Sequence, residues 1–308
     1  MYRKAQVKAA RDWFLRPVVD RIDAMHLAIG RMESHRIRGQ TFADIGAAEF
    51  KVFSQFGEDG ILQYLLAKVP ITNRTFVEIG VGDYRESNTR FLLQKDNWRG
   101  LIIDRGTSHL AFLESSSLRW RYRVDGISAF VTPGNINGVL THGGFEGEIG
   151  LLSIDIDGND YWLLEGIKAV EPQIVVVEYN SMFGPDLAVT VPYDPRFDRF
   201  EAHYSGLYFG ASLGALCELA SARGYRFVGS SSSGVNAFFV RGDVAGALPE
   251  KTAAEGWVAS SVRESRDRRG RLTYVGEVGQ QLRLVGHLPL FNVVDGSTAS
   301  VAELLPEP

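Results

Sequence analysis

Residues 75–82, Thr-Phe-Val-Glu-Ile-Gly-Val-Gly, carry the pattern that points most clearly to chemistry. An acid, Glu78, lies inside an apolar run that breaks at Gly80 and Gly82. In open α/β sheets, a strand that passes through a glycine turn into a helix forms a cofactor crevice at its carboxyl end. The dinucleotide fingerprint needs a third glycine, but this chain has Arg85 in that place. The motif therefore predicts a cofactor site and disfavours pyrophosphate binding.

A second acid, Asp104, ends the next apolar run, 26 residues beyond Glu78. An acid at this position can accept both hydrogen bonds of a ribose diol. The alternative is a polar strand end that only caps the following turn. Together with Glu78, Gly80 and Gly82, Asp104 favours an adenosyl cofactor.

Two further groups of oxygen-bearing side chains follow later strands. Asp155, Asp157 and Asp160 lie close together, and Glu178 and Asn180 follow the next strand. Because neighbouring parallel strands end at the same crevice, up to four oxygen ligands can converge there. Mg²⁺ binds to a few carboxylates, with water and substrate oxygens completing an octahedron. We predict a metal site of Asp155, Asp157, Glu178 and Asn180, with Asp155 also beside the cofactor.

Two other interpretations of these acids stay open. In one, a single acid acts as a base without metal and the others hold loops. In the other the acids have only a structural role, because Asp-x-Asp-Gly is also a good turn and helix cap.

The elements that must position these side chains alternate between strand and helix. Five βα units with continuous apolar strands predict an α/β fold with a mainly parallel, Rossmann-like sheet covered on both faces. A last pair of strands with no helix between them predicts an antiparallel edge. The expected strands are 75–79, 100–104, 121–131, 149–156, 173–178, 225–230 and 235–241, and the expected helices begin near residues 54, 87, 108, 134, 159 and 211.

The chain divides into three predicted regions: 1–40, 41–245 and 246–308. A long aromatic connection over 181–209 is expected to be ordered. The last region is expected to be a small, partly β extension, with strands at 274–275 and 282–285.

Residues 1–40 predict a basic helix with a heptad-like apolar seam within residues 15–32. Such a seam favours a homo-oligomer formed by pairing with a second copy. Packing on the protein's own core, or contact of a basic face with an anionic membrane, are the alternatives. The seam residues are spaced 3-4-3-4-3: Leu15, Val18, Ile22, Met25, Ile29 and Met32.

The composition is that of an ordinary globular protein. The 308 residues are 45% hydrophobic and 23% charged, with a net charge of −4, so no nucleic-acid partner is expected. The single Cys217 lies in an apolar helical setting and fits a reducing compartment. We expect no signal peptide and no transmembrane segment, and therefore a cytoplasmic location.

Several motifs together resemble FkbM-type and related bacterial S-adenosylmethionine-dependent O-methyltransferases. The resemblance implies a seven-stranded class I methyltransferase fold, with Gln55 near the cofactor carboxylate, Glu78, Gly80 and Gly82 along its methionine moiety, and Asp104 at its ribose. It also implies a sugar hydroxyl as acceptor. Asp157 departs from the common pattern, which has glutamate in its place. The resemblance covers roughly residues 50–241, and its motifs lie at 54–62, 77–82, 153–162, 177–180 and 234–240.

A sugar hydroxyl is a poor acid, so methyl transfer to it needs a general base or a metal that lowers its pKa. The catalytic candidates are Asp155, Asp157 and His203, the last in the long connection. The leading hypothesis is thus a carbohydrate O-methyltransferase, with Mg²⁺ as a second cofactor. The alternatives are an NAD-dependent nucleotide-sugar oxidoreductase and a non-catalytic partner with the same fold.

Overall fold

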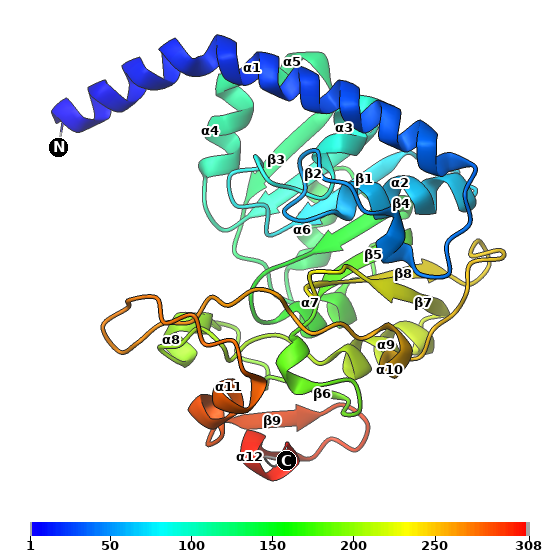
Figure 1. The fold of residues 1–308 in the computed structure, drawn as a ribbon, viewed down its shortest axis with the longest axis vertical. Helices are drawn as coiled ribbons and strands as arrows, with labels where there is room; N and C mark the ends of the chain where they lie inside the picture. Colours follow the sequence, from blue (N-terminus) through cyan, green and yellow to red (C-terminus); the bar gives the residue numbers. More distant parts are fainter. Residues whose placement is uncertain (1, 306–308) are drawn as a thin grey trace.

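The core of the protein is one sheet with a single antiparallel member. In the computed structural model, which describes residues 2–305 and side chains from residue 17 onward, seven strands follow the order β3-β2-β1-β4-β5-β8-β7 (Figure 1). Only β8 runs antiparallel to its neighbours among these strands. The predicted α/β fold, with a mainly parallel, Rossmann-like sheet of seven strands and an antiparallel edge, is confirmed. Its strands are β1 (Thr75–Ile79), β2 (Arg99–Asp104), β3 (Val124–Ser128), β4 (Gly147–Ile154), β5 (Val170–Glu178), β7 (Tyr225–Ser230) and β8 (Asn236–Arg241).

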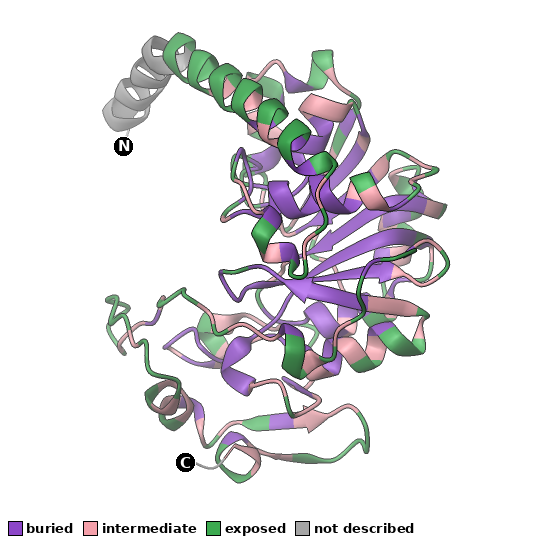
Figure 2. Cartoon of the chain, turned by 45° about the vertical axis from the view of Figure 1, so that its right-hand side comes forward, coloured by how far each residue is buried: buried purple, intermediate pink, exposed green. Residues whose placement is uncertain are grey.

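The central strands are buried on both faces because their side chains alternate between two hydrophobic cores. In β1, Phe76 belongs to one core, whereas Val77 and Ile79 belong to the other. In β2, Ile102 and Ile103 are divided in the same way. Because both faces of each central strand are buried, the strands need continuous apolar runs in the sequence. Figure 2 shows the sheet buried between its helices.

Helices cover both faces of the sheet. The first core includes side chains of α1 (Tyr2–Arg38), α2 (Glu58–Lys68), α3 (Arg90–Asp96), α4 (Ser108–Ser115) and α5 (Leu118–Arg121). The second core includes side chains of α6 (Ile136–His142), α7 (Asp160–Gly166) and α9 (Leu213–Ala222). The remaining helices are η1 (Ile45–Ala48), η2 (Ser181–Phe183), α8 (Arg199–Ala202), α10 (Ala253–Gly256), α11 (Val278–Val285) and α12 (Val301–Leu304).

The long connection and the C-terminal region fold together. A strand of the connection, β6 (Val189–Thr190), pairs with β9 (Pro289–Asn292), which pairs with β10 (Thr298–Ser300). A separate apolar cluster joins the two segments, including Phe183 and Val189 from one and Val285 and Leu290 from the other. The connection is ordered because the C-terminal region supplies its core.

The strands predicted at 274–275 and 282–285 are wrong. The second segment lies in α11, and the first is irregular chain. Val278, Leu282 and Val285 follow each other at i, i+4 and i+7, which places them on one face of a helix. That face packs on the connection, where Val285 is fully buried. The true strands of this region begin only at Pro289.

The N-terminal helix α1 has one face on the body and an apolar stripe on its exposed side (Figures 1 and 2). Asp23 forms an ion pair with Arg90, and the backbone at Gly30 packs so closely on Val52 and Phe91 that a Cβ there would overlap them. The opposite face exposes Ile22, Met25, Ile29 and Met32 by 45–70%, together with Val18, while the side chain of Leu15 lies outside the described residues. Within the described residues, no helix is long and apolar enough to cross a membrane.

Candidate active site

A cavity of about 600 Å³ opens at the carboxyl ends of β1, β2, β4 and β5. This is the size of pocket that holds a cofactor-sized molecule, which typically takes about 300–1,000 Å³. Among the residues predicted to bind cofactor or metal, those that line the cavity are Gln55, Gly80, Gly82, Asp104, Asp155, Asp157, Glu178 and Asn180. Glu78 and His203 do not line it.

The two glycines of the β1 turn are required for different reasons. Gly80 has a φ of +89°, and a Cβ there would lie 1.5 Å from the carbonyl oxygen of Asp155. Gly82 has a φ of +55°, but no atom lies within 4 Å of the place where its Cβ would be. Gly80 thus allows β1 and β4 to approach each other, whereas Gly82 leaves open space in the cavity.

Asp104 connects the turn to the end of β2. Its Oδ2 accepts a hydrogen bond from the backbone N–H of Gly82 at 2.8 Å, and its Oδ1 accepts one from Gly106 at 2.7 Å. Each carboxylate oxygen has a second acceptor position. Asp104 can therefore hold the turn and still accept the two hydroxyls of a ribose.

Glu78 lies behind the turn, where it organises the loop that leads to α3. It is 5% exposed and accepts hydrogen bonds from the hydroxyls of Ser87 and Thr89 and from the backbone N–H groups of Asn88 and Thr89. Burial raises its pKa, and these donors act against the shift. The helix expected to begin near Ser87 begins at Arg90, and the Ser87 hydroxyl, besides donating to Glu78, accepts hydrogen bonds from the N–H groups of Thr89 and Arg90.

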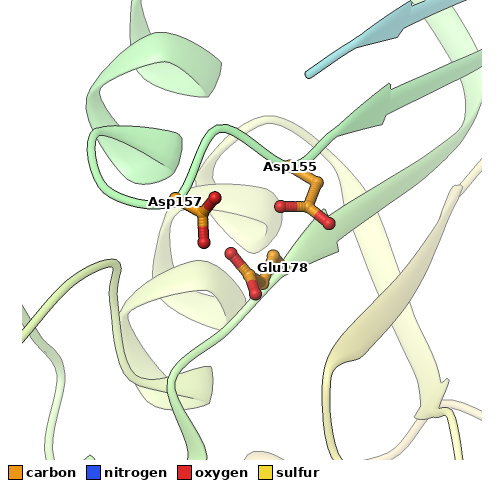
Figure 3. A group of neighbouring side chains, drawn as sticks. All are labelled: Asp155, Asp157 and Glu178. Carbon is orange, nitrogen blue, oxygen red and sulfur yellow. The ribbon is translucent and has the colours of Figure 1, made fainter. Parts of the chain in front are cut away.

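Three carboxylates converge at the ends of β4 and β5. Asp155, Asp157 and Glu178 each place an oxygen within 4.8 Å of the others, and Figure 3 shows them pointing toward one another. Oε2 of Glu178 is buried and has no hydrogen-bond partner among the described residues. An unpaired buried acceptor of this kind is costly, so the cluster has room and need for a proton or a cation.

The pKa shifts of these carboxyls also indicate that the cluster needs a proton or a cation. Burial raises the pKa of Asp155 to about 8, with the charges of Asp157 and Asp160 adding to the shift. Burial also raises the pKa of Glu178 well above its usual range, and Asp155 adds to that shift. Arg199, from α8, pairs with Asp157 and supplies the nearest positive charge. Without a bound cation, the Asp155 and Glu178 pair retains a proton near neutral pH.

Two of the polar side chains near the cluster serve the loops around it. Asp160 accepts hydrogen bonds from the backbone N–H groups of Ile156 and Gly158, at 2.8 and 2.9 Å, and so closes the β4–α7 turn. Asn180 donates to the carbonyl oxygens of Leu207 and Phe209 and accepts from the N–H of Met182. Both of its N–H donors thus tie the end of β5 to the connection, whereas Oδ1 keeps a second acceptor position.

His203 lies away from the cluster. Its side chain is buried, its Nδ1 lies 2.7 Å from the hydroxyl of Ser205, and its ring packs against Tyr204 and His287. Burial lowers its pKa, and the nearby charge of His287 lowers it further. Since it does not line the cavity, the structure does not bring it to the carboxylates.

The C-terminal region adds a wall that the motifs did not reveal. Ser260, Glu264 and Gln281 line the cavity, and Glu264 approaches Arg199 at 3.9 Å. No signal in the sequence identifies them, because they lie in irregular chain and a short helix some 80 residues beyond Glu178. They reach the cavity only through the fold of the long connection.

Comparisons with known proteins add a fold-level similarity. No family model matches the chain, and no curated protein matches it. One similar solved structure is an O-methyltransferase from Bacillus cereus in complex with SAH, which is 16% identical over 54% of this chain and 72% of that chain, with a TM-score of 0.35. A protein described as a possible O-methyltransferase from Klebsiella pneumoniae is 14% identical over 75% of this chain and 94% of that chain, with a TM-score of 0.38. An O-methyltransferase family protein from Burkholderia thailandensis is 11% identical over 79% of this chain and 60% of that chain, with a TM-score of 0.36. At these identities the similarity concerns the fold alone.

Replacing Glu78 with glutamine tests the support behind the turn. We expect Glu78→Gln to lower the free energy of unfolding by at least about 2 kcal/mol, because an amide nitrogen then faces buried donors. Glu86→Gln, on the exposed part of the same loop, is the control and should stay within about 0.5 kcal/mol of the wild type. Denaturant unfolding measures both, and equal stabilities would refute this role of Glu78.

Proposed function

We propose that the protein is an S-adenosylmethionine-dependent O-methyltransferase that acts on a carbohydrate hydroxyl with the help of Mg²⁺. The observation that carries this proposal is the arrangement within one cavity: the open turn at Gly82, bound to Asp104, faces the three converging carboxylates. A nucleoside cofactor and a group that handles a proton are thereby held side by side.

The cavity suits an adenosyl cofactor. Gly82 leaves space beside the turn, and the carboxylate of Asp104 keeps acceptor positions for a ribose diol. Phe130 and Val131, which follow β3 next to Asp104, line the cavity with the apolar surface that a nucleobase needs. Gln55, from the loop before α2, gives a polar group on the side where the resemblance expects the cofactor carboxylate.

Bound S-adenosylmethionine would supply a methyl group already activated on a sulfonium. The chain must then align the acceptor oxygen and take its proton. When no cation is bound, Asp155 and Glu178 are suited to the second task, because burial raises the pKa of Asp155 to about 8 and that of Glu178 well above its usual range. A base whose pKa lies near the working pH transfers protons most effectively.

The three carboxylates also suit Mg²⁺, which prefers carboxylate oxygens and retains waters or substrate oxygens. Asp155, Asp157 and Glu178 would hold the ion, and the unpaired Oε2 of Glu178 is the oxygen with most to gain. The ion would lower the pKa of a hydroxyl placed on it. Asn180 lines the same cavity, and its Oδ1, which accepts one hydrogen bond from Met182, keeps a second acceptor position, so Asn180 remains the fourth proposed ligand.

The carbohydrate acceptor is supported by an aromatic ring at the cavity and by the FkbM-type motifs. Phe130 lines it and is 45% exposed, so an apolar ring face is available to the C–H surface of a sugar. An oxidoreductase using NAD is the less favoured alternative, since Arg85 takes the place of the third glycine. A cytoplasmic location and the absence of a nucleic-acid partner stay predictions.

Calorimetry with S-adenosylhomocysteine tests the cofactor. We expect the wild type to bind it and Gly82→Ala to bind at least about tenfold more weakly, a loss of about 1.4 kcal/mol, because the new methyl group enters the cavity. Gly246→Ala is the matched control: its φ of +56° imposes the same backbone strain in open space away from the cavity. Absence of binding at millimolar ligand would end the proposal, and binding of NAD instead would revive the oxidoreductase.

Thermal unfolding with Mg²⁺ or EDTA tests the metal. At about 100 times its dissociation constant, Mg²⁺ should stabilise the wild type by about 2.7 kcal/mol. Glu178→Gln should abolish this effect, without loss of stability in EDTA, because it removes a buried charge but keeps the side-chain shape. Glu165→Gln, an exposed change on α7, should respond like the wild type. An equal response of Glu178→Gln, or transfer activity that survives EDTA, would remove the metal from the proposal.

For the exposed stripe of α1 we propose pairing with a second copy of the chain. The stripe follows heptad spacing and lies on the exposed side of the helix. The opposite side can therefore stay packed on the rest of the protein while the stripe pairs with a second copy. The double change Met25→Glu and Met32→Glu should convert an oligomer to a monomer in light scattering, because it puts charges into the seam. Val294→Glu, at a site that is also 70% exposed, should leave the mass unchanged. A wild type that is monomeric at high micromolar concentration would contradict the proposal.

A further inference from the structure

The C-terminal region contains a strongly basic loop beside the cavity. Residues 263–271, Arg-Glu-Ser-Arg-Asp-Arg-Arg-Gly-Arg, hold five arginines against two carboxylates in a chain whose net charge is −4. The loop is the orange segment next to α8 in Figure 1. We refer to it as the arginine loop.

Part of the positive charge in the loop is neutralised and part is free. Arg266 pairs with Glu264, and Arg271 pairs with Asp267. Arg263, Arg268 and Arg269 are exposed and form no ion pair with a carboxylate within the described part of the chain. Two of these three free charges, those of Arg268 and Arg269, lie at the tip of the loop.

Aromatic rings hold two of the guanidinium groups. Arg266 lies over the ring of Phe200 at 5.1 Å, and Arg268 lies over Tyr204 at 4.8 Å. Arg266 donates its terminal N–H groups to Glu264 and to the carbonyl oxygen of Gly270, so it holds the shape of the loop. Arg268, stacked on its ring, keeps its in-plane N–H groups available within the described part of the chain, and this planar fork binds phosphate oxygens in pairs. The loop thus presents a positioned donor as well as charge.

A second, shallow hollow of about 410 Å³ lies over this loop. It is lined by Tyr204, Arg266, Arg268 and Arg269, with Thr273 and Leu284 among the others. It adjoins the cavity, because Glu264 and Phe200 line the cavity while their partner Arg266 lines the hollow. Glu264 and Arg268 are four residues apart, so at most about 14 Å of chain separates the two sites.

The two sites have opposite charge. The cavity is lined by two arginines, Arg105 and Arg199, against six carboxylates: Asp104, Asp155, Asp157, Glu178, Asp198 and Glu264. An anionic group is repelled by this excess of carboxylates, whereas a neutral polyhydroxyl ring is not. The hollow is lined by three arginines against one carboxylate, Asp267, and has the reverse preference. A single substrate that binds to both the cavity and the hollow must be neutral at the ring that reacts. It must also carry an anionic group one linkage away from that ring.

We propose that the acceptor is a glycosyl phosphate or diphosphate, whose sugar enters the cavity while its phosphate binds the arginine loop. This inference rests on the proposed function, which supplies the sugar hydroxyl as acceptor. It adds a second site, with Arg268 and Arg269 as the residues that select phosphorylated acceptors. A nucleoside diphosphate sugar and a polyprenyl diphosphate sugar share this chemistry.

Inorganic pyrophosphate is the first probe, because its binding does not depend on methyl transfer. Calorimetry should show binding by the wild type, and the double variant Arg268→Gln and Arg269→Gln should weaken it at least tenfold. The control is Arg119→Gln with Arg123→Gln, two exposed arginines near α5 on the other side of the molecule, and it should bind like the wild type. Wild-type protein that does not bind pyrophosphate, or a loop variant that binds as tightly as the control, overturns the inference.

Transfer assays then separate the sources of the phosphate. A nucleoside diphosphate hexose, a polyprenyl diphosphate hexose and the free hexose are compared as acceptors. With a phosphorylated acceptor of either kind, the loop variant should raise KM at least tenfold with kcat within twofold, and it should not change KM for the free sugar. A free sugar used as efficiently as both phosphorylated forms overturns the inference. S-adenosylhomocysteine binding without pyrophosphate binding defeats this inference alone, whereas the absence of both defeats the proposed function as well.

Discussion

The parallel register of four strands is the constraint on which the site depends. Ile79 of β1 pairs with Ile103 of β2 and with Ile154 of β4, and Ile154 pairs with Val177 of β5. The next residue of each strand is therefore level with the others: Gly80, Asp104, Asp155 and Glu178. A shift of one residue in any pair would send a side chain to the opposite face of the sheet. The glycine at position 80 maintains this register, since only a residue without a Cβ fits against the carbonyl of Asp155.

This register has an electrostatic consequence. It places carboxylates from β4 and β5 within 4.8 Å of one another in a buried setting, where ionised groups repel each other strongly. The surrounding loops do not relieve the repulsion, because the charge of Asp160 adds to it and the N–H donors of Asn180 bind backbone carbonyls. Arg199 relieves it in part by pairing with Asp157. A cluster that keeps unfavourable charge in an otherwise well-satisfied core is typical of a functional site.

The fold and the cofactor side of the site could be predicted from the sequence because their signals are local. Apolar runs, a glycine turn and acids at strand ends all lie within a few residues of the backbone that they shape, so the strands and Asp104 were located correctly. The segment 282–285 was not, because alternating Leu282 and Leu284 resemble a strand until Val278 and Val285 are placed on the same helical face. Glu264 and Gln281 could not be found at all. Their position in the cavity depends on the pairing of β6 with β9, a long-range contact that no local pattern encodes.

The same long-range pairing gives the molecule its division of charge. The sheet alone provides a cavity with acidic strand ends, and such a cavity would accept a small neutral molecule without regard to what is attached to it. The C-terminal region is fixed to the long connection by β6, β9 and a shared apolar cluster, which places a basic loop next to the acidic cavity. Because neighbouring regions of opposite sign favour a ligand with matching parts, the proposed specificity depends on the junction between the sheet and the C-terminal region. In this proposal the chemistry depends on the geometry of the strand ends, whereas the choice of acceptor depends on a segment that the motifs do not cover.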